Sequence, residues 1–178
     1  MNNSKKSTGH TATDAITLLK ADHQKVKELF RQFEALQDGD SQNKSKIVAE
    51  ICHELSIHAQ VEEEIFYPAM RSAMDDEALM DEADVEHAAA KGLIKLLEAM
   101  APGDDHYAAT VTVLGEEIDH HVHEEEGKMF PKAIKARVNI ALLGEQIIQR
   151  KQELEAQHSR LRPAATGNKR KPAQHEHR

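Results

Sequence analysis

Two short stretches of this chain carry histidine and glutamate at the same spacing. The first reads HAQVEEEIFYP from His58, and the second reads HVHEEEGKMFP from His121. In both, a glutamate follows the histidine by four positions, a second glutamate by five, an aromatic residue by nine and a proline by ten. Because four residues make about one helical turn, each histidine and its first glutamate (Glu62, Glu125) leave a helix on the same side. Two such pairs on two helices are what a dinuclear metal site inside a helical bundle requires.

Long helices must position these residues. Apolar spacing and turn signals predict four long helices and a shorter amphipathic one, over about residues 13–37, 44–74, 77–100, 106–136 and 139–160. Asp14 and the acids at 75–77 favour helix starts. Pro68 and Pro131 are expected to end or kink their helices, since proline lacks the N–H group and clashes with the preceding turn. The expected fold is all-α, an up-down four-helix bundle with an additional short C-terminal helix.

A histidine takes one apolar position in the inward face of each long helix. The expected inward faces are Ile16-Leu19-His23-Val26-Phe30-Phe33, Ile47-Ile51-Leu55-His58-Glu62-Ile65-Ala69, Met80-Ala83-His87-Ala90-Ile94-Leu97 and Val111-Leu114-Ile118-His121-Glu125-Met129. At ~1.5 Å per residue, each of the four histidines lies roughly 18 to 21 Å from the turn that joins its helix pair. Six side chains should therefore meet in one layer: His23, His58, Glu62, His87, His121 and Glu125.

The histidines next to His121 leave a choice of ligand. His121 and Glu125 continue an apolar face, whereas His120 and Glu124 continue a mixed row that we expect to face solvent. Surface positions are also expected for other residues of these types, some of them accessory candidates: His53, His106, His123 and Glu126. The histidines of the tails are assigned no role: His10, His175 and His177.

A metal-free polar core is the alternative to a metal site. Removing an unpaired glutamate from water costs several kcal/mol, and no Lys or Arg lies in the predicted faces to neutralise Glu62 and Glu125. Mixed imidazole and carboxylate ligands favour iron or manganese, with zinc as a further candidate. Six protein ligands for two ions leave coordination positions open, which predicts a reactive site for dioxygen, peroxide or nitric oxide.

Composition and charge define the class of protein. The chain has 178 residues, 3% aromatic residues, no Trp and one cysteine, Cys52, which excludes an internal disulfide framework and fits a reducing compartment. No secretory h-region or long apolar run is present, so we expect a cytoplasmic protein without a membrane span. Of the net charge of −8, residues 12–159 hold −15, which attracts cations and repels nucleic acid.

The expected domain organisation is a disordered tail at 1–12, a helical bundle at 13–160 and a disordered basic tail at 161–178. The basic tail is interpreted as solubilising rather than as a nucleic-acid contact, because no aromatic residue accompanies it. Within the bundle the pattern occurs twice, since Asp22-His23 corresponds to Glu86-His87 at an offset of 64. Two helical hairpins of one ancestral pattern are therefore expected to pack together.

Over about residues 13–136 the chain resembles the hemerythrin-like, HHE cation-binding family. The motifs His58-x3-Glu62-Glu63 and His121-x3-Glu125-Glu126, each with its hydrophobic-aromatic-Pro ending, carry the resemblance. It implies a four-helix bundle that holds two non-haem iron ions with an oxo or hydroxo bridge. It also implies a ligand set: His23 and His58 on one iron, His87 and His121 on the other, and Glu62 and Glu125 as bridges.

Hemerythrins that carry oxygen use a fifth histidine, one helical turn from the histidine that corresponds to His87. Ala83 and Lys91 stand at that spacing here, so the resemblance favours sensing, iron handling or peroxide chemistry over oxygen storage. Three hypotheses follow. The chain is a di-iron protein that binds or senses a small ligand, a di-iron enzyme that consumes peroxide or oxidises ferrous iron, or a metal-free bundle with a polar layer.

Overall fold

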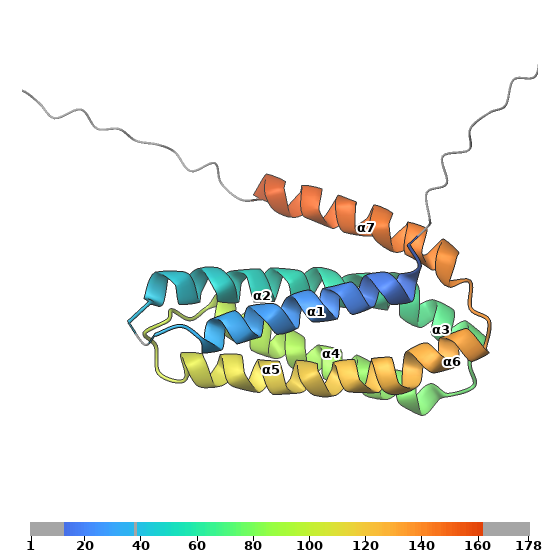
Figure 1. Cartoon of the computed structure of the whole chain (residues 1–178), viewed down its shortest axis with the longest axis horizontal. Coiled ribbons are helices and arrows are strands. Elements are labelled where there is room, and N and C mark those ends of the chain that lie inside the picture. Colours follow the sequence, from blue (N-terminus) through green and yellow to red (C-terminus); the bar gives the residue numbers. More distant parts are fainter. Residues whose placement is uncertain (1–12, 38, 162–178) are drawn as a thin grey trace, which may run out of the picture.

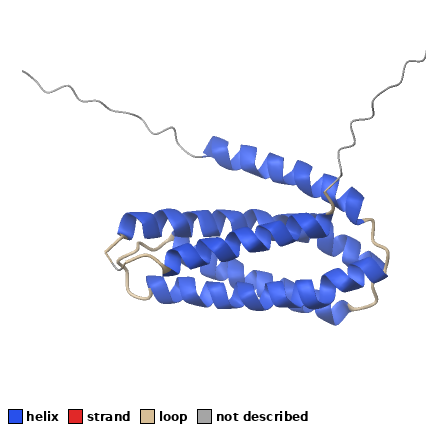
Figure 2. Cartoon of the chain, in the orientation of Figure 1, coloured by secondary structure: helices blue, strands red, loops and turns tan. Residues whose placement is uncertain are grey.

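The computed structural model describes residues 13–37 and 39–161, and this part of the chain contains helices and no strand (Figure 2). The segments are α1 (Ala15–Glu34), α2 (Ser41–Val61), η1 (Glu62–Phe66), α3 (Tyr67–Ala73), α4 (Glu77–Glu98), α5 (Tyr107–Glu124), η2 (Glu125–Met129), α6 (Phe130–Lys135) and α7 (Ile140–Leu161). In Figure 1, α2 runs through η1 into α3 and α5 runs through η2 into α6, so four rods form a bundle and α7 lies along it. The all-α four-helix bundle with an additional C-terminal helix is thus confirmed.

The helix starts follow from local capping. Asp14 accepts a hydrogen bond from the Thr17 backbone N–H at 2.9 Å and so caps α1. Asp76 accepts one from the Leu79 N–H at 3.4 Å and caps α4. Each satisfies a backbone donor that has no partner within the helix. Asp38 of the turn before α2, the predicted N-terminal tail (1–12) and all of the predicted C-terminal tail (161–178) except Leu161, which ends α7, lie outside the described residues.

The core consists of two apolar clusters. The first apolar cluster includes Leu19, Phe66, Tyr67, Met70, Met80, Met129, Phe130 and Ile147. The second apolar cluster includes Val26, Ile51, Leu55, Ala90, Ile94, Val111 and Leu114. Along α1, His23 stands between Leu19 of the first cluster and Val26 of the second. The histidine positions thus form a level between two apolar regions, which supply most of the burial that stabilises the bundle.

Helix α7 covers one side of the bundle and joins the first apolar cluster through Leu143, Ile147 and Leu154. It has 22 residues, as many as α4, and was expected to be the shorter helix. Its start lies very close to the start of α1. A Cβ atom on Gly144 would stand 2.3 Å from the backbone oxygen of Thr13, so only glycine allows this approach. No described helix is long and apolar enough to cross a lipid bilayer.

Pro68 and Pro131 were expected to end or kink their helices. Neither proline ends its helix. Each follows a single turn of π-helix, in which the Tyr67 N–H bonds to the Glu62 oxygen and the Phe130 N–H bonds to the Glu125 oxygen. The wider turn takes up one extra residue just before Pro68 and Pro131, which then sit at the start of α3 and α6, where a missing N–H is tolerated.

The π turn also changes which residues face inward beyond Glu62. Continuing the α-helical spacing predicted Ile65 and Ala69 as core residues, and both are only partly buried. Phe66, Tyr67 and Met70 are buried in their place. One inserted residue rotates the following helix by about 100°, and this brings Tyr67 to the polar layer.

Candidate metal centre

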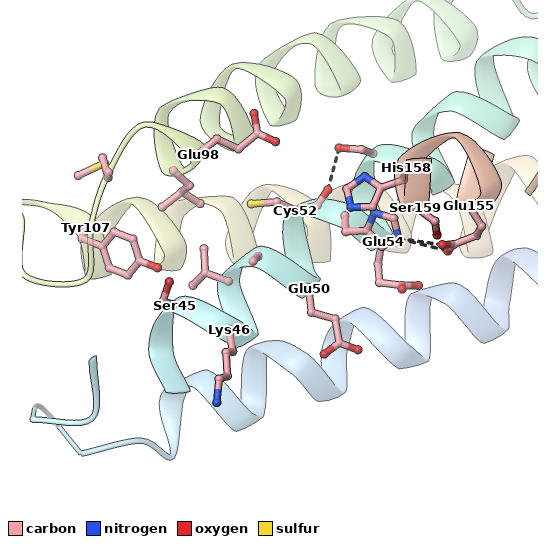
Figure 3. A pocket seen from close by; sticks show the side chains of 16 residues that line it. Ser45, Lys46, Glu50, Cys52, Glu54, Glu98, Tyr107, Glu155, His158 and Ser159 are labelled. Atoms are coloured by element: carbon pink, nitrogen blue, oxygen red, sulfur yellow. Dashed lines mark hydrogen bonds and ion pairs between the residues drawn. The ribbon is translucent and has the colours of Figure 1, made fainter. Parts of the chain in front are cut away.

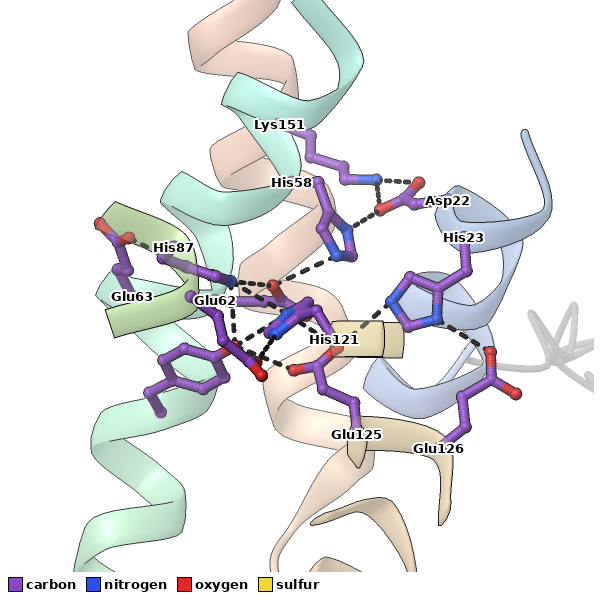
Figure 4. A network of polar contacts seen from close by, with 12 residues as sticks. Asp22, His23, His58, Glu62, Glu63, His87, His121, Glu125, Glu126 and Lys151 are labelled. Atoms are coloured by element: carbon purple, nitrogen blue, oxygen red, sulfur yellow. Dashed lines mark hydrogen bonds and ion pairs between the residues drawn. The ribbon is translucent and has the colours of Figure 1, made fainter. Parts of the chain in front are cut away.

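The six side chains predicted to form one layer lie together inside the bundle (Figure 4). All are buried, with exposed fractions between 0% for Glu62 and 5% for His58 and His87. Within the described residues they are also the polar or charged residues that count as buried. The structure brings these six side chains together as predicted. Their assignment as metal ligands stays a prediction.

The layer divides into two groups of potential ligand atoms. One group combines His23, His58, Glu62 and Glu125, and the other combines Glu62, His87 and His121, with atoms of each group within 4.8 Å of one another. Oε2 of Glu62 lies 3.2 Å from Nε2 of His58 and 3.4 Å from Nε2 of His87. Oε2 of Glu125 lies 3.2 Å from Nε2 of His23 and 3.6 Å from Nε2 of His121. Each carboxylate therefore stands between a histidine of one hairpin and a histidine of the other.

Every histidine of the layer is held from behind by a second carboxylate. The contacts are His23 Nδ1–Glu126 at 2.9 Å, His58 Nδ1–Asp22 at 3.1 Å, His87 Nδ1–Glu63 at 2.9 Å and His121 Nδ1–Glu86 at 2.7 Å (Figure 4). A carboxylate accepts a hydrogen bond from Nδ1–H, and in that tautomer the lone pair of Nε2 is directed into the layer. Such carboxylate–histidine pairs fix the ring orientation at metal sites.

These four outer carboxylates were only partly anticipated. Glu126 was expected at the surface, but it contacts His23 and is therefore part of the site. The repeat carried the missing signal: the acid after each ligand glutamate holds a histidine of the other hairpin, and the acid before His23 and His87 holds the partner histidine of the same hairpin. An alternating role of this kind is visible only when four helices are placed in space.

Several inner atoms of the layer lack hydrogen-bond partners. Buried atoms without one include Nε2 of His23, Nε2 of His58, both oxygens of Glu62 and Oε2 of Glu125. Nε2 of His87 and Nε2 of His121 lie 3.1 Å apart. When Nδ1–H of each ring donates a hydrogen bond to its outer carboxylate, the Nε2 lone pairs of the two rings face each other. Buried acceptors in such numbers are costly unless a proton or a metal cation lies among them, so the residues present fit a metal site.

The electrostatics of the metal-free layer are uneven: although burial opposes it, neighbouring carboxylates raise the pKa of His23 and the pKa of His121. Burial raises the pKa of Glu62 well above its ordinary value, and the nearby Glu125 carboxylate raises it further. Burial also opposes ionisation of Glu125, but the imidazoles of His23 and His121 lower its pKa to about 2. Burial lowers the pKa of His58 despite Asp22, which favours the neutral imidazole that binds metals. Without a cation, the two central carboxyl groups thus do not ionise alike.

Sequence reasoning missed Tyr67 as a residue of the site. Its hydroxyl donates a hydrogen bond to Glu125 Oε1 at 3.0 Å and lies 3.1 Å from Nε2 of His87 and 3.4 Å from Nε2 of His121. Burial, followed by the charges of Glu62 and Glu125, raises the pKa of Tyr67 well above its usual range. The available signal was the aromatic residue nine positions after His58, which is a tyrosine in one motif and a phenylalanine in the other.

A small cavity lies on the other side of the layer from Tyr67. Its volume is about 20 Å³, and it is lined by Asp22, His23, Val26, Leu55, His58, His87, Ile118, His121 and Val122. Val26 and Leu55 belong to the second apolar cluster, whereas Tyr67 belongs to the first. The space suits one water-sized or diatomic molecule, held between the histidines and an apolar wall.

The remaining histidines have other positions. His120 is 59% exposed and contacts Glu86 at 3.3 Å, so it stands outside the layer as expected. His106 is exposed, also as expected. His53 was expected at the surface, but it is partly buried beneath α7 and contacts Glu155. The tail histidines at positions 10, 175 and 177 lie outside the described residues.

Comparisons with known proteins agree with the fold and with cation binding. A model of the Hemerythrin HHE cation binding domain matches residues 14–133. A curated Nostoc protein named DNA nickase is 28% identical over 150 residues, which are 84% of this chain but only 40% of that protein. A crystal structure of a hemerythrin HHE cation binding domain-containing protein from Mycobacterium kansasii superposes with a TM-score of 0.71 at 23% identity, covering 83% of this chain and 90% of that one. At that identity the likeness shows the fold.

Proposed function

The chain belongs to the hemerythrin HHE cation-binding family, and from this premise we propose that its buried layer holds a non-haem di-iron centre that binds or senses dioxygen or a related small ligand. The observation that carries the proposal is the set of buried ring nitrogens and carboxylate oxygens without a hydrogen-bond partner, namely Nε2 of His23, Nε2 of His58, both oxygens of Glu62 and Oε2 of Glu125. Positive charge is needed there, and Lys151 is already engaged by Asp22 behind the ring of His58.

The donor set supports iron and a pair of ions. Imidazole nitrogen and carboxylate oxygen are ligands that iron favours, with manganese and zinc as weaker candidates. Glu62 belongs to both ligand groups, and Glu125 reaches histidines of both hairpins. Two carboxylates shared in this manner suit two ions side by side. When bound, such an iron pair supplies open coordination positions and electrons for an oxygen-containing ligand.

The residues of the chain would orient the metal ligands, limit what enters the small cavity and hold a proton close to the site. The four outer carboxylates keep each Nε2 directed inward, which preorganises the ligand set. Val26, Leu55 and Val122 give the small cavity an apolar wall and limit its size to about 20 Å³. Tyr67 holds a proton 3.0 Å from Glu125, on the far side of the layer.

A second candidate is an enzyme that removes peroxide or oxidises ferrous iron, and Tyr67 favours it. A buried phenol that keeps its proton next to a reactive centre can act as a general acid. Peroxide consumption by the iron-loaded protein is the test. The enzyme hypothesis expects a rate that falls at least tenfold in His58→Ala and clearly in Tyr67→Phe, while a rate unchanged by His58→Ala contradicts it.

The nickase name describes a relative of which this chain spans 40%. The shared region is the helical bundle, and residues 12–159 carry a charge of −15, which opposes contact with a phosphate backbone. We therefore propose cation binding, and not strand cleavage, as the role of the shared region.

Adjacent histidines provide a matched pair of variants for the test. The protein is loaded with ferrous iron without oxygen, then exposed to air, and iron content and the absorption spectrum are measured. We expect about two iron ions per chain and an oxo-bridge absorption band in wild type and in His120→Ala, and loss of both in His121→Ala. A purified protein that binds no iron, or equal iron content in the two variants, contradicts the proposal. A band that bleaches irreversibly excludes reversible oxygen binding but leaves the di-iron proposal itself intact.

A further inference from the structure

A second group of histidine and glutamate side chains lies where α7 crosses α2, outside the buried layer. His53 and Glu54 come from α2, and Glu155 and His158 come from α7; Figure 3 shows Glu54, Glu155 and His158 close together. Nε2 of His53 lies 3.2 Å from both carboxylate oxygens of Glu155. The rings of His53 and His158 lie 4.2 Å apart between centroids. We propose that these four side chains, which we name the α2–α7 cluster, bind a divalent cation of the zinc type.

The spacing of the ligands suits chelation. Potential ligand atoms of His53, Glu54 and Glu155 lie within 4.8 Å of one another. Glu155 and His158 are three positions apart and share one face of α7. Two ligands of tetrahedral zinc at about 2.0–2.1 Å stand roughly 3.3 Å from each other. The 3.2 Å between His53 and Glu155 already matches that separation.

The surrounding charge favours a cation. Lys25 forms an ion pair with Glu54 at 2.7 Å. Although burial works against it, Glu54, Glu50 and Glu155 raise the pKa of Lys25, so three carboxylates act on one ammonium group. The local excess of negative charge attracts a second cation, and the two imidazoles select one that accepts nitrogen ligands.

The α2–α7 cluster differs from the buried layer in access to solvent. It borders a groove of about 950 Å³ whose lining includes Cys52, Glu98 and Tyr107 (Figure 3). The side chains of His53 and Glu155 are 20% and 52% exposed. A cation can therefore enter and leave without opening the bundle, which suits an exchangeable ion that fastens α7.

The alternative is a simple ion pair between a protonated His53 and Glu155. It accounts for their contact, but an exposed pair of this kind holds two side chains together only weakly. It leaves the position of the second imidazole, His158, to its ring contact with His53 alone. A metal cation uses His53 and both carboxylates, whose potential ligand atoms already lie within 4.8 Å of one another, and would take up His158 from beside the His53 ring.

Zinc titration by calorimetry tests the proposal on the full chain. Wild type should bind about one more Zn²⁺ per chain than the double variant His53→Gln/His158→Gln, and Glu155→Gln should bind that ion at least tenfold more weakly. Zinc should slow amide hydrogen exchange at residues 153–160 of the wild type and not of the double variant. His106→Asn, which removes an exposed histidine whose backbone conformation asparagine tolerates, is the matched control and should bind zinc as wild type does.

Equal zinc stoichiometry and affinity in wild type and the double variant would overturn the proposal, as would an equal loss in His106→Asn. The buried layer is the same in all these proteins, so their difference reports on the α2–α7 cluster alone. Iron content is measured in parallel. The double variant should keep its iron, so failure of the zinc site leaves the di-iron proposal intact, and failure of iron loading leaves the zinc difference interpretable.

Discussion

The two halves of the buried layer are built from the same pattern but end in different aromatic residues. In the His23/His58 half, Phe130 stacks on His23 with ring centroids 6.0 Å apart and an interplanar angle of 5°. In the His87/His121 half, Tyr67 lies over His87 at 5.2 Å and 38°, and its hydroxyl reaches the polar atoms. The repeat thus builds an even ligand set, and a single hydroxyl group makes one half polar where the other is apolar.

The halves also differ in what stands behind the outer carboxylates. Asp22, which holds His58, is paired with Lys151 of α7. Glu86, which holds His121, is paired with the exposed His120. The other two outer carboxylates do not distinguish the halves, since each contacts a lysine: Glu63 contacts Lys91 at 2.6 Å and Glu126 contacts Lys20 at 3.7 Å. The first half therefore depends on a helix that lies outside the repeat.

The largest effect should come from Glu62→Gln, which breaks both halves at once. Removing the carboxylate shared by the two ligand groups should lower bound iron to less than a tenth of the wild-type content, measured by elemental analysis. In the metal-free protein, the folded-state pKa of Glu62 is raised. Its stabilising contribution is thus complete below the unfolded pKa of about 4.3 and is lost as pH rises, by up to about 1.4 kcal/mol per pH unit.

Glutamine imitates the protonated acid, so the metal-free variant should not show this loss in denaturant titrations at increasing pH. A Glu62→Gln protein that retains its iron, or whose stability has the same pH dependence as wild type, would contradict a shared and buried carboxylate. Lys91→Met, which leaves both ligand groups in place, serves as the control.

Gly144→Ala should affect the two halves of the layer differently, because α7 contacts the outer carboxylate of only one of them. The new Cβ would stand 2.3 Å from the Thr13 oxygen, so α7 must shift, at a cost of about 2 to 3 kcal/mol in the free energy of unfolding. Amide exchange should quicken in α7 and around His58 and stay unchanged around His121. Uniform quickening through both halves would show that α7 supports the whole bundle equally.

Substitutions at Tyr67 and Phe130 should remove or reverse the difference in polarity between the two halves of the layer. Tyr67→Phe loses the hydrogen bond to Glu125 and should lower the free energy of unfolding by about 1 kcal/mol, while iron content stays as in wild type. Phe130→Tyr places a hydroxyl beside His23 and should cost about 2 kcal/mol unless it finds a partner. Equal effects of the two changes in denaturant titrations would mean that the hydroxyl is not what distinguishes the halves.

The smallest effect concerns the outer pairs. Burial raises the pKa of Asp22, but His58 and Lys151 outweigh it and the pKa is lowered. This stabilisation is present above the unfolded pKa of about 3.9 and is lost as pH falls through the folded value. Lys151→Met should therefore cost about 1 kcal/mol at neutral pH and less in acid. His120→Ala, at the corresponding but exposed position, should change stability by less than about 0.5 kcal/mol.

Much of the fold could be predicted because the pattern is local and repeated. The helix over 77–98 and the capping by Asp14 and Asp76 follow from spacing and residue type. The meeting of His23, His58, His87 and His121 follows from equal distances to the turns, since antiparallel helices of equal reach bring such positions level. The choice of His121 over His120 for the inward position follows from the apolar face that it continues.

The rest depends on contacts that no local pattern encodes. The π turn at Glu62–Phe66 shifts the helical spacing by one residue. Phe66 therefore replaces Ile65 in the core, although the sequence spacing favours Ile65. Glu126 and Tyr67 acquire their contacts only when α1 and α4 are placed beside them. His53 becomes partly buried because α7 folds back over α2, and the sequence predicts that helix without its docking place.

The contact between Lys151 and Asp22 makes α7 a participant in a binding equilibrium. Since Asp22 holds the ring of His58, docking of α7 and loading of the layer share a free energy of coupling. Such coupling is reciprocal. By whatever factor a docked α7 tightens cation binding at His58, a bound cation must favour the docked α7 by the same factor. A molecule that captured α7 would therefore weaken the centre without touching a ligand, and an emptied centre would release the helix more readily.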